Sequence, residues 1–217
     1  MFRDRYHAGH RLAGALRHLR GTDSVVLALP RGGVPVGFEV AKALSVPLDL
    51  LLVRKIGVPA HEELALGAVV DGTNPQLVLN EEVMAAARPP AGYIETALRK
   101  ALAEIERRRR LYLADAEPVE IAGRAAVVID DGIATGATMK AALRGVRRNQ
   151  PYRLVLAVPV APGASVDELR SECDEAVVLE TPEPFYAVGS HYADFNQTTD
   201  EEVVALLAKA RAWRRST

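Results

Sequence analysis

The chain has 217 residues, of which 49% are apolar and 25% are charged, and its formal net charge is −1. This length suits a single domain, residues 1–217, with a substantial buried core. The near-neutral charge lacks the basic field typical of nucleic-acid-binding proteins. No apolar run reaches the roughly 18 residues that a membrane span requires, and the charged opening Met1–Arg5 is unlike a signal peptide.

The single cysteine, Cys173, excludes an internal disulfide framework and fits a reducing compartment. We therefore expect a cytoplasmic protein without nucleic-acid or membrane partners. The first predicted element is a helix from Asp4 to about Leu19, with a repeating apolar face. Arg3 and Arg5 at its start are interpreted as solvent-facing charges.

The first strong strand pattern, Ser24–Leu29, ends in a glycine-containing loop with the sequence Pro-Arg-Gly-Gly. A helix follows through about Leu44, so this loop lies at a helix amino terminus, where unpaired N–H groups and the helix dipole favour anions. Arg31 in the loop could add a charge-assisted hydrogen bond. The alternative is a tight turn carrying an exposed arginine.

A second strand is predicted from Pro47 to Val53, and Arg54 and Lys55 follow it directly. Adjacent cations at the carboxyl end of a strand suit an anion ligand, although an ordinary basic loop would have the same composition. Two further strands are predicted at residues 67–70 and 76–79, separated by a turn rich in Asp, Gly, Asn and Pro.

A long helix is predicted from about Tyr93 to Asp115, and it contains four consecutive arginines, Arg107–Arg110. Such a run could indicate a nucleic-acid-binding patch. Four consecutive helical residues point around the whole cylinder, however, and acidic residues precede the run. A solvated, charge-balanced face is therefore the favoured interpretation.

The most informative stretch is Ala125–Met139. It opens with five apolar residues, typical of a strand buried on both faces of a parallel sheet, and Asp130 and Asp131 follow at the carboxyl end. A loop of Gly, Ala and Thr then leads into a helix. Such a loop can bind a phosphate, and the two carboxylates suit the vicinal hydroxyls of a sugar, with a metal ion offsetting their charge.

Competing motifs fail on spacing. The loop has no Lys where a P-loop requires one, and Gly132 and Gly136 are too far apart for a dinucleotide fingerprint. The acid pair alone could equally be a divalent-ion pocket or an exposed strand end. The attached Ala-Thr-Gly-Ala-Thr loop favours a sugar phosphate.

The remaining pattern is a strand at residues 153–159, a helix at 162–172, a strand at 176–179 and a closing helix from Asp200 to about Trp213. Strands alternating with helices through short links predict an α/β fold with a doubly wound, mostly parallel sheet. An aromatic-rich segment, residues 181–199, precedes the last helix without a clear period.

The stretch Val127–Thr138 resembles the phosphoribosyl pyrophosphate (PRPP) binding motif of the type I phosphoribosyltransferases. The form Asp-Asp-x-x-Ala-Thr-Gly-x-Thr-Met is most similar to the adenine phosphoribosyltransferases. It departs from the hypoxanthine-guanine enzymes, which have an acidic general base at the position of Ala134. Gly132 also departs from the family, where an apolar side chain is more usual.

This resemblance implies a fold with a mobile flap at about residues 56–80 and a C-terminal hood at about residues 181–199. It implies Mg²⁺ as cofactor, which Asp130 and Asp131 could reach through ribose or water, and a homodimer. His61 and Glu62 fall at the start of the flap, as surface residues or as contributors to the chemistry. The implied catalytic residues are Arg31, Lys55, Asp130 and Asp131.

Each part of the substrate has implied ligands in this sequence. Asp130 and Asp131 would hold the ribose hydroxyls, and Phe185 or Tyr186 in the hood would stack on a base. The pyrophosphate would bind Arg31, Gly32, Gly33, Arg54 and Lys55. The 5′-phosphate would bind Ala134, Thr135, Gly136, Ala137 and Thr138.

The function implied is transfer of the 5-phosphoribosyl group from PRPP to a nitrogenous base or related acceptor, with release of pyrophosphate, as in nucleotide salvage. The alternative is a non-catalytic regulator that binds PRPP, which would be expected to present a DNA- or RNA-binding face. A third possibility is an accessory enzyme with an unfamiliar acceptor.

Overall fold

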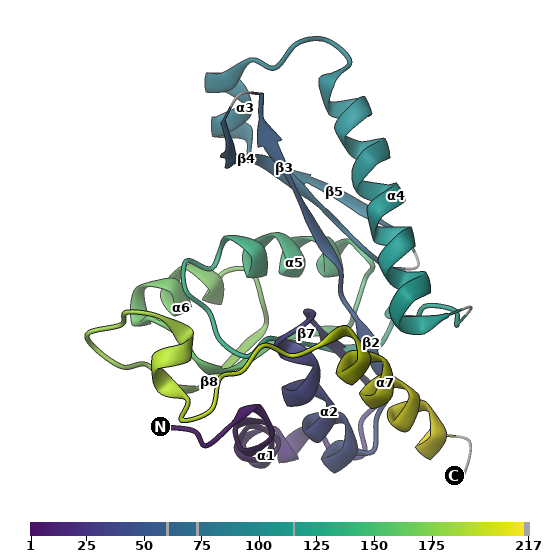
Figure 1. Cartoon of the computed structure of the whole chain (residues 1–217), viewed down its shortest axis with the longest axis vertical. Helices are drawn as coiled ribbons and strands as arrows, with labels where there is room; N and C mark the ends of the chain where they lie inside the picture. Colours follow the sequence, from purple (N-terminus) through teal and green to yellow (C-terminus); the bar gives the residue numbers. More distant parts are fainter. Residues whose placement is uncertain (60, 73, 115, 215–217) are drawn as a thin grey trace.

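The structure is a computed structural model that describes residues 1–59, 61–72, 74–114 and 116–214. Its main sheet has five parallel strands in the order β2-β1-β6-β7-β8 (Figure 1). This arrangement confirms the predicted α/β fold class. The strands are β1 (Ser24–Ala28), β2 (Leu48–Leu50), β6 (Ala125–Ile129), β7 (Arg153–Val160) and β8 (Glu175–Glu180).

Helices cover both faces of this sheet, as a doubly wound fold requires. One face carries α1 (Arg5–Ala15), α2 (Gly33–Leu44) and α7 (Asp200–Arg214), and the other carries α5 (Ala137–Arg148) and α6 (Gly163–Arg170). Short 3-10 helices lie at Arg17–Leu19 and Val188–His191. None of the helices in the described ranges is both long and apolar enough to cross a membrane.

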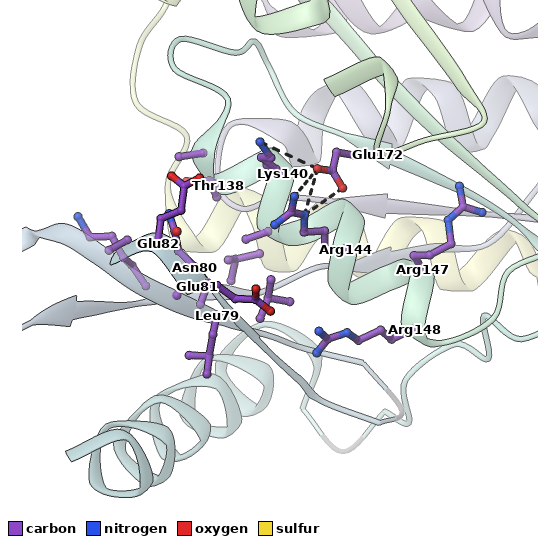
Figure 2. A pocket seen from close by; sticks show the side chains of 18 of the residues that line it. Leu79, Asn80, Glu81, Glu82, Thr138, Lys140, Arg144, Arg147, Arg148 and Glu172 are labelled. Carbon is purple, nitrogen blue, oxygen red and sulfur yellow. Dashed lines mark hydrogen bonds and ion pairs between the residues drawn. The ribbon is translucent and has the colours of Figure 1, made fainter. Parts of the chain in front are cut away.

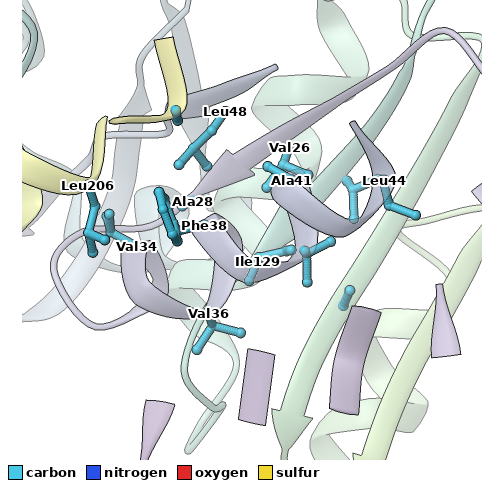
Figure 3. Packing of buried hydrophobic residues seen from close by; sticks show 14 of the residues in the cluster. Val26, Ala28, Val34, Val36, Phe38, Ala41, Leu44, Leu48, Ile129 and Leu206 are labelled. Atoms are coloured by element: carbon cyan, nitrogen blue, oxygen red, sulfur yellow. The ribbon is translucent and has the colours of Figure 1, made fainter. Parts of the chain in front are cut away.

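The apolar runs of the central strands follow from burial on both sides. In β1, Val26 and Ala28 pack into the α2 side of the sheet, together with Ile129 of β6 (Figure 3). Val25 and Leu27 point the opposite way, into the cluster beneath α5. Successive strand residues face opposite sides, so a strand covered on both faces is apolar at most of its positions.

A second, antiparallel sheet extends away from the first (Figure 1). It consists of β3 (Val53–Val58), β4 (His61–Val70) and β5 (Gln76–Leu79), and the helices α3 (Glu81–Ala87) and α4 (Tyr93–Leu113) follow it. Its apolar cluster includes Ile56, Leu66 and Ile105. We call β3–β5, α3 and α4 together the flap unit.

The flap unit corrects the predicted second strand. That strand was expected to run from Pro47 to Val53, but β2 ends at Leu50 and Val53 already begins β3 of the other sheet. The antiparallel sheet also begins three residues before the predicted flap boundary at residue 56. Arg54 and Lys55 therefore lie within a flap strand and not in a loop at the end of a core strand.

A buried ion cluster joins the flap unit to the main sheet. Arg109 of α4 donates to Asp71, which follows β4, at 2.5 Å, and it lies 3.4 Å from Asp49 in β2. Asp49 also accepts backbone hydrogen bonds from Leu50 and Val119. All three charged side chains are buried.

This cluster corrects the interpretation of the arginine run as a uniformly solvated face. Arg107 and Arg108 pair with Glu104, and Arg110 pairs with Glu106, on the exposed side of α4 as expected. Arg109 instead points inward. Burial raises the pKa of Asp71, and the Arg109 guanidinium opposes that rise.

We predict that Arg109→Met destabilises the protein by about 3–5 kcal/mol, because it leaves two buried carboxylates without their cation. Urea unfolding would measure the change. The matched control is Arg110→Met, in the same helix, which removes an exposed ion pair and should have little effect. Equal effects of the two substitutions would contradict a role for the buried cluster.

Candidate active site

The candidate site lies where the order of the main sheet reverses. Strands β1 and β6 are neighbours, but the chain proceeds from β1 to β2 at one edge and from β6 to β7 toward the other. The loops that follow β1 and β6 therefore lie side by side at the carboxyl ends of the strands, the edge where ligands bind in open α/β folds. The amide of Leu29 donates to the carbonyl of Ile129, which fixes the start of one loop against the other.

The glycines of the first loop pack directly on the acid pair. A Cβ atom on Gly32 would lie 2.0 Å from Oδ2 of Asp131, and one on Gly33 would lie 2.8 Å from the carbonyl oxygen of Ile129. Both distances are far inside van der Waals contact. The sequence favours glycine in this loop because an anion can then approach the backbone closely. The structure shows a second reason for glycine at these positions: the two loops lie so close together that a side chain would not fit.

Asp130 and Asp131 emerge together from β6, as predicted. The backbone N–H of Asp131 donates to Oδ1 of Asp130 at 2.8 Å. Burial, followed by the neighbouring Asp131 carboxylate, raises the pKa of Asp130 well above its usual range. Burial also raises the pKa of Asp131, while Arg5 opposes that rise.

Arg5 was expected on the solvent-facing side of the first helix, and the structure corrects this. Its Nε donates to Oδ2 of Asp131 at 2.7 Å, with the two side chains only 11% and 13% exposed. Arg5 is an isolated arginine and belongs to no recognisable sequence motif. No local pattern could have indicated this pairing, because the partners lie 126 residues apart in sequence.

The second loop has the features of a phosphate-binding loop. Gly136 adopts a φ of 78° and caps α5, whose first amides lack intrahelical partners. Ile133 is buried and donates its N–H to the carbonyl of Val160, which anchors the loop. Solvent-exposed residues surround the helix start: Ala134, Thr135, Ala137 and Thr138.

Arg31 lies in the first loop, and its guanidinium is oriented toward α7. Its Nη1 is 3.4 Å from Oδ1 of Asp200, which also accepts a 2.7 Å hydrogen bond from the hydroxyl of Tyr112. The Tyr112 hydrogen bond and then Arg31 lower the pKa of Asp200. To bind pyrophosphate, Arg31 would therefore have to break its contact with Asp200 or keep that contact while also binding the ligand.

Lys55 lines a groove of about 880 Å³ between the flap sheet and α5 (Figure 2). Ala137 and Thr138, at the start of α5, line the same groove, so it reaches the predicted phosphate loop. Arg54 precedes Lys55 in β3 and projects from the opposite face of the sheet. The structure thus separates two cations that the sequence placed together.

The groove also contains basic residues that were not predicted as ligands. Arg144 pairs with Glu172 at 2.6 Å, and Lys140 lies 4.0 Å from the same carboxylate (Figure 2). Arg147 pairs with Asp174, and Arg148 donates to the carbonyl of Leu77. Two carboxylates, Glu172 and Asp174, thus face the four cations of α5.

The predicted hood packs on the acid pair through unexpected residues. The hydroxyl of Tyr192 donates to the carbonyl oxygen of Asp131 at 2.5 Å. A Cβ atom on Gly132 would lie 2.5 Å from Cγ1 of Val188. The hood's Val188 therefore occupies the space that an apolar side chain at position 132 would need, which explains the departure of Gly132 from the family pattern.

The residues predicted to stack on a base differ in their surroundings. The ring of Phe185 stacks on His191, with centroids 5.1 Å apart, and Tyr186 is 83% exposed. Their role stays a prediction. In the flap, the exposed His61 begins β4, while the side chain of Glu62 lies outside the described part of the structure.

The described residues contain no group of three or more His, Cys, Asp or Glu side chains placed to hold a metal ion. Two adjacent carboxylates still supply the hard oxygen donors that Mg²⁺ prefers when a substrate completes its coordination. The acid pair therefore fits a metal that arrives with a phosphorylated ligand.

A family model described as the phosphoribosyl transferase domain matches residues 5–189. The chain belongs to this family. Its resemblance to type I phosphoribosyltransferases, inferred above from the motif, is thereby confirmed.

Two relatives cover nearly the whole chain. The chain is 47% identical over 210 residues to "Putative phosphoribosyl transferase Rv0571c" of Mycobacterium tuberculosis, a match that covers 97% of this chain and 47% of that protein. The chain thus spans about half the length of the curated relatives it matches. The crystal structure of TT1426 from Thermus thermophilus is similar with a TM-score of 0.80 and 45% identity, covering 96% of this chain and 98% of that one.

A more distant structure, the AQ2163 protein from Aquifex aeolicus, matches with a TM-score of 0.50 and 12% identity. The match covers 85% of this chain and 78% of that protein. At this identity the similarity shows the fold alone.

We predict that Gly132→Ala costs about 1–3 kcal/mol in unfolding free energy, because the added methyl overlaps Val188. Adding Val188→Ala should recover part of that loss in a double-mutant cycle measured by urea unfolding. Gly14→Ala in α1 is the matched control, because its Cβ would meet no atom within 4 Å. Strictly additive effects at positions 132 and 188 would contradict the contact.

Proposed function

We propose that this protein is a phosphoribosyltransferase that transfers the 5-phosphoribosyl group of PRPP to a nitrogenous base or related acceptor. The observation that carries the proposal is the meeting of three groups at one switch point. A partly buried acid pair, an exposed loop at the start of α5 and an arginine-glycine loop at the start of α2 lie at the ends of adjacent strands. They suit a ribose with phosphate groups at both ends.

In this proposal each loop binds one part of PRPP. The amides and hydroxyls of residues 134–138 bind the 5′-phosphate, because the start of a helix favours an anion. Asp130 and Asp131 accept hydrogen bonds from the ribose hydroxyls. Gly32 and Gly33 offer backbone to the pyrophosphate, and Arg31 moves from Asp200 to neutralise its charge.

The reaction breaks the bond between C1 of the ribose and the pyrophosphate oxygen, which leaves with the electron pair. A nitrogen of the acceptor forms the new bond to C1, and its proton passes to solvent or to a general base. Positive charge develops on the ribose in the transition state. In this proposal the two carboxylates stabilise that charge while the loops hold the leaving group in line.

Mg²⁺ would be held by pyrophosphate and ribose oxygens near Asp130 and Asp131, and it would offset the charge of the leaving group. The flap unit presents Lys55 to the groove that reaches the phosphate loop. Closure of this unit would place that cation near pyrophosphate and exclude water from C1. We further propose a cytoplasmic homodimer that acts in nucleotide salvage.

We predict that Asp130→Asn combined with Asp131→Asn weakens PRPP binding by at least about a hundredfold, because two charge-assisted hydrogen bonds are worth about 1.5–3 kcal/mol each. Isothermal titration with Mg²⁺–PRPP would measure this, with circular dichroism confirming the fold. Asp167→Asn is the control, since that side chain is 81% exposed. Unchanged affinity in the double variant would refute the assignment of the acid pair.

Adding a panel of free bases to the PRPP-loaded protein, with pyrophosphate release as the readout, tests the reaction itself. We expect release with one acceptor class and none without an acceptor. PRPP binding without release for any base would favour the regulatory alternative. An absence of PRPP binding would contradict the function proposed here.

A further inference from the structure

Asp200, the first residue of α7, contacts both the first loop of the site and the flap unit. Its Oδ1 lies 3.4 Å from Nη1 of Arg31 and accepts a 2.7 Å hydrogen bond from the hydroxyl of Tyr112 in α4. Helix α7 itself packs against both α2 and α4 (Figure 1). One carboxylate oxygen therefore links the loop that precedes α2 to a helix of the flap unit.

The two contacts of Asp200 differ in strength. The Tyr112 hydroxyl lies at the ordinary distance for an O–H···O hydrogen bond, whereas 3.4 Å from Nη1 of Arg31 is longer than usual for N–H···O. The side chains of Arg31 and Asp200 are 35% and 41% exposed, so water competes for their ion pair. Of the two partners of Asp200, Arg31 is therefore the one that an anionic ligand can detach.

The carboxylate of Asp200 stays satisfied when Arg31 leaves it. Tyr112 is buried, and it lies in the same helix as Arg109, whose ion cluster joins the base of the flap unit to the main sheet. The Tyr112 hydrogen bond and then Arg31 lower the pKa of Asp200, so this carboxylate is charged at neutral pH. Because the hydrogen bond from Tyr112 does not depend on Arg31, the departure of Arg31 leaves the carboxylate with a donor from α4.

We infer that Asp200 is a positioning residue for Arg31, which holds the guanidinium against α7 until pyrophosphate binds and receives it again when pyrophosphate leaves. This inference rests on the function proposed above, in which Arg31 neutralises the charge of pyrophosphate. Asp200 competes with the ligand for one cation, so it weakens pyrophosphate binding and favours release of the product. In this role it acts through Arg31 and not by contacting the ligand.

The test is the binding of Mg²⁺–pyrophosphate to Asp200→Asn, measured by titration calorimetry. Asparagine removes the charge, and its carbonyl oxygen can still accept the hydrogen bond from Tyr112. The affinity should rise roughly twofold to fivefold, because an exposed ion pair contributes about that factor. The affinity for ribose 5-phosphate should not change, because that ligand has no pyrophosphate for Arg31 to bind. An unchanged or weaker affinity for pyrophosphate, or an equal gain for ribose 5-phosphate, would overturn the inference.

A double-mutant cycle with Arg31→Met determines whether Asp200 acts through Arg31. Arg31→Met alone should weaken pyrophosphate binding by about tenfold or more, because a charge-assisted hydrogen bond is lost. Adding Asp200→Asn to this variant should give no further gain, because the cation that Asp200 holds is gone. An equal gain in both backgrounds would mean that Asp200 repels the ligand directly, which is a different role from the one inferred.

Glu201→Gln is the matched control. Glu201 is the next residue in α7, its side chain is exposed, and its replacement by glutamine removes the same charge from the same helix turn. The pyrophosphate affinity of this variant should stay close to that of the wild type. A gain as large as that of Asp200→Asn would show a general effect of negative charge at the start of α7, and it would overturn the inference.

Chemical modification separates this inference from the proposed function. Phenylglyoxal modifies accessible arginine side chains, and mass spectrometry locates the modified residue. Without ligand, Arg31 should be modified faster in Asp200→Asn than in the wild type, and at the wild-type rate in Glu201→Gln. Equal rates in all three proteins would overturn the inference even if PRPP bound. A faster rate in a protein that binds neither PRPP nor pyrophosphate would refute the proposed function and the pyrophosphate role, while the pairing of Arg31 with Asp200 would stand.

Discussion

The site depends on accommodating two neighbouring carboxyl groups at the end of a buried strand. Burial makes the charged form costly, and the adjacent acid increases that cost. The structure meets this constraint with a cation from α1 and with glycine loops close enough to enclose the acids. The first helix, the α2 loop and the hood all contact Asp131.

The hood and the amino terminus behave as one structural element as a result. The amide of Phe2 donates to the carbonyl of His191, and the amide of Ala193 donates to the carbonyl of Phe2. The ring of Phe2 packs against Tyr192 in the same buried cluster. Because Tyr192 and Val188 also contact Asp131 and Gly132, the surroundings of the acid pair are formed by residues from both ends of the chain.

The flap unit is attached to the main sheet in a different way. Its own sheet is antiparallel and has its own apolar cluster, whereas its link to the core includes the buried pair of acids around Arg109. A buried ion cluster is weak as a source of stability but specific in its geometry. It fixes the base of the flap unit, and Lys55 lies two residues along β3 from Val53, which pairs with Val70 at that base.

The sequence alone predicted the parallel strands β1, β6, β7 and β8 and the position of the acid pair after β6, because these depend on local patterns of burial and on adjacent residues. It also predicted that Gly136 could adopt a positive φ, and the structure has φ 78° at this residue. It did not indicate Arg5, and it placed Arg54 and Lys55 at the end of the wrong sheet. These errors concern residues whose partners are distant in the chain.

Only the tertiary structure decided which arginines are buried. Arg109 is indistinguishable in sequence from its three neighbours, and Arg5 resembles any charge at the start of a surface helix. Each acquires its role from carboxylates brought near by the packing of α4 and α1 against the main sheet. Local patterns specify secondary structure and motifs, whereas the pairing of charges across 126 residues depends on the packed fold.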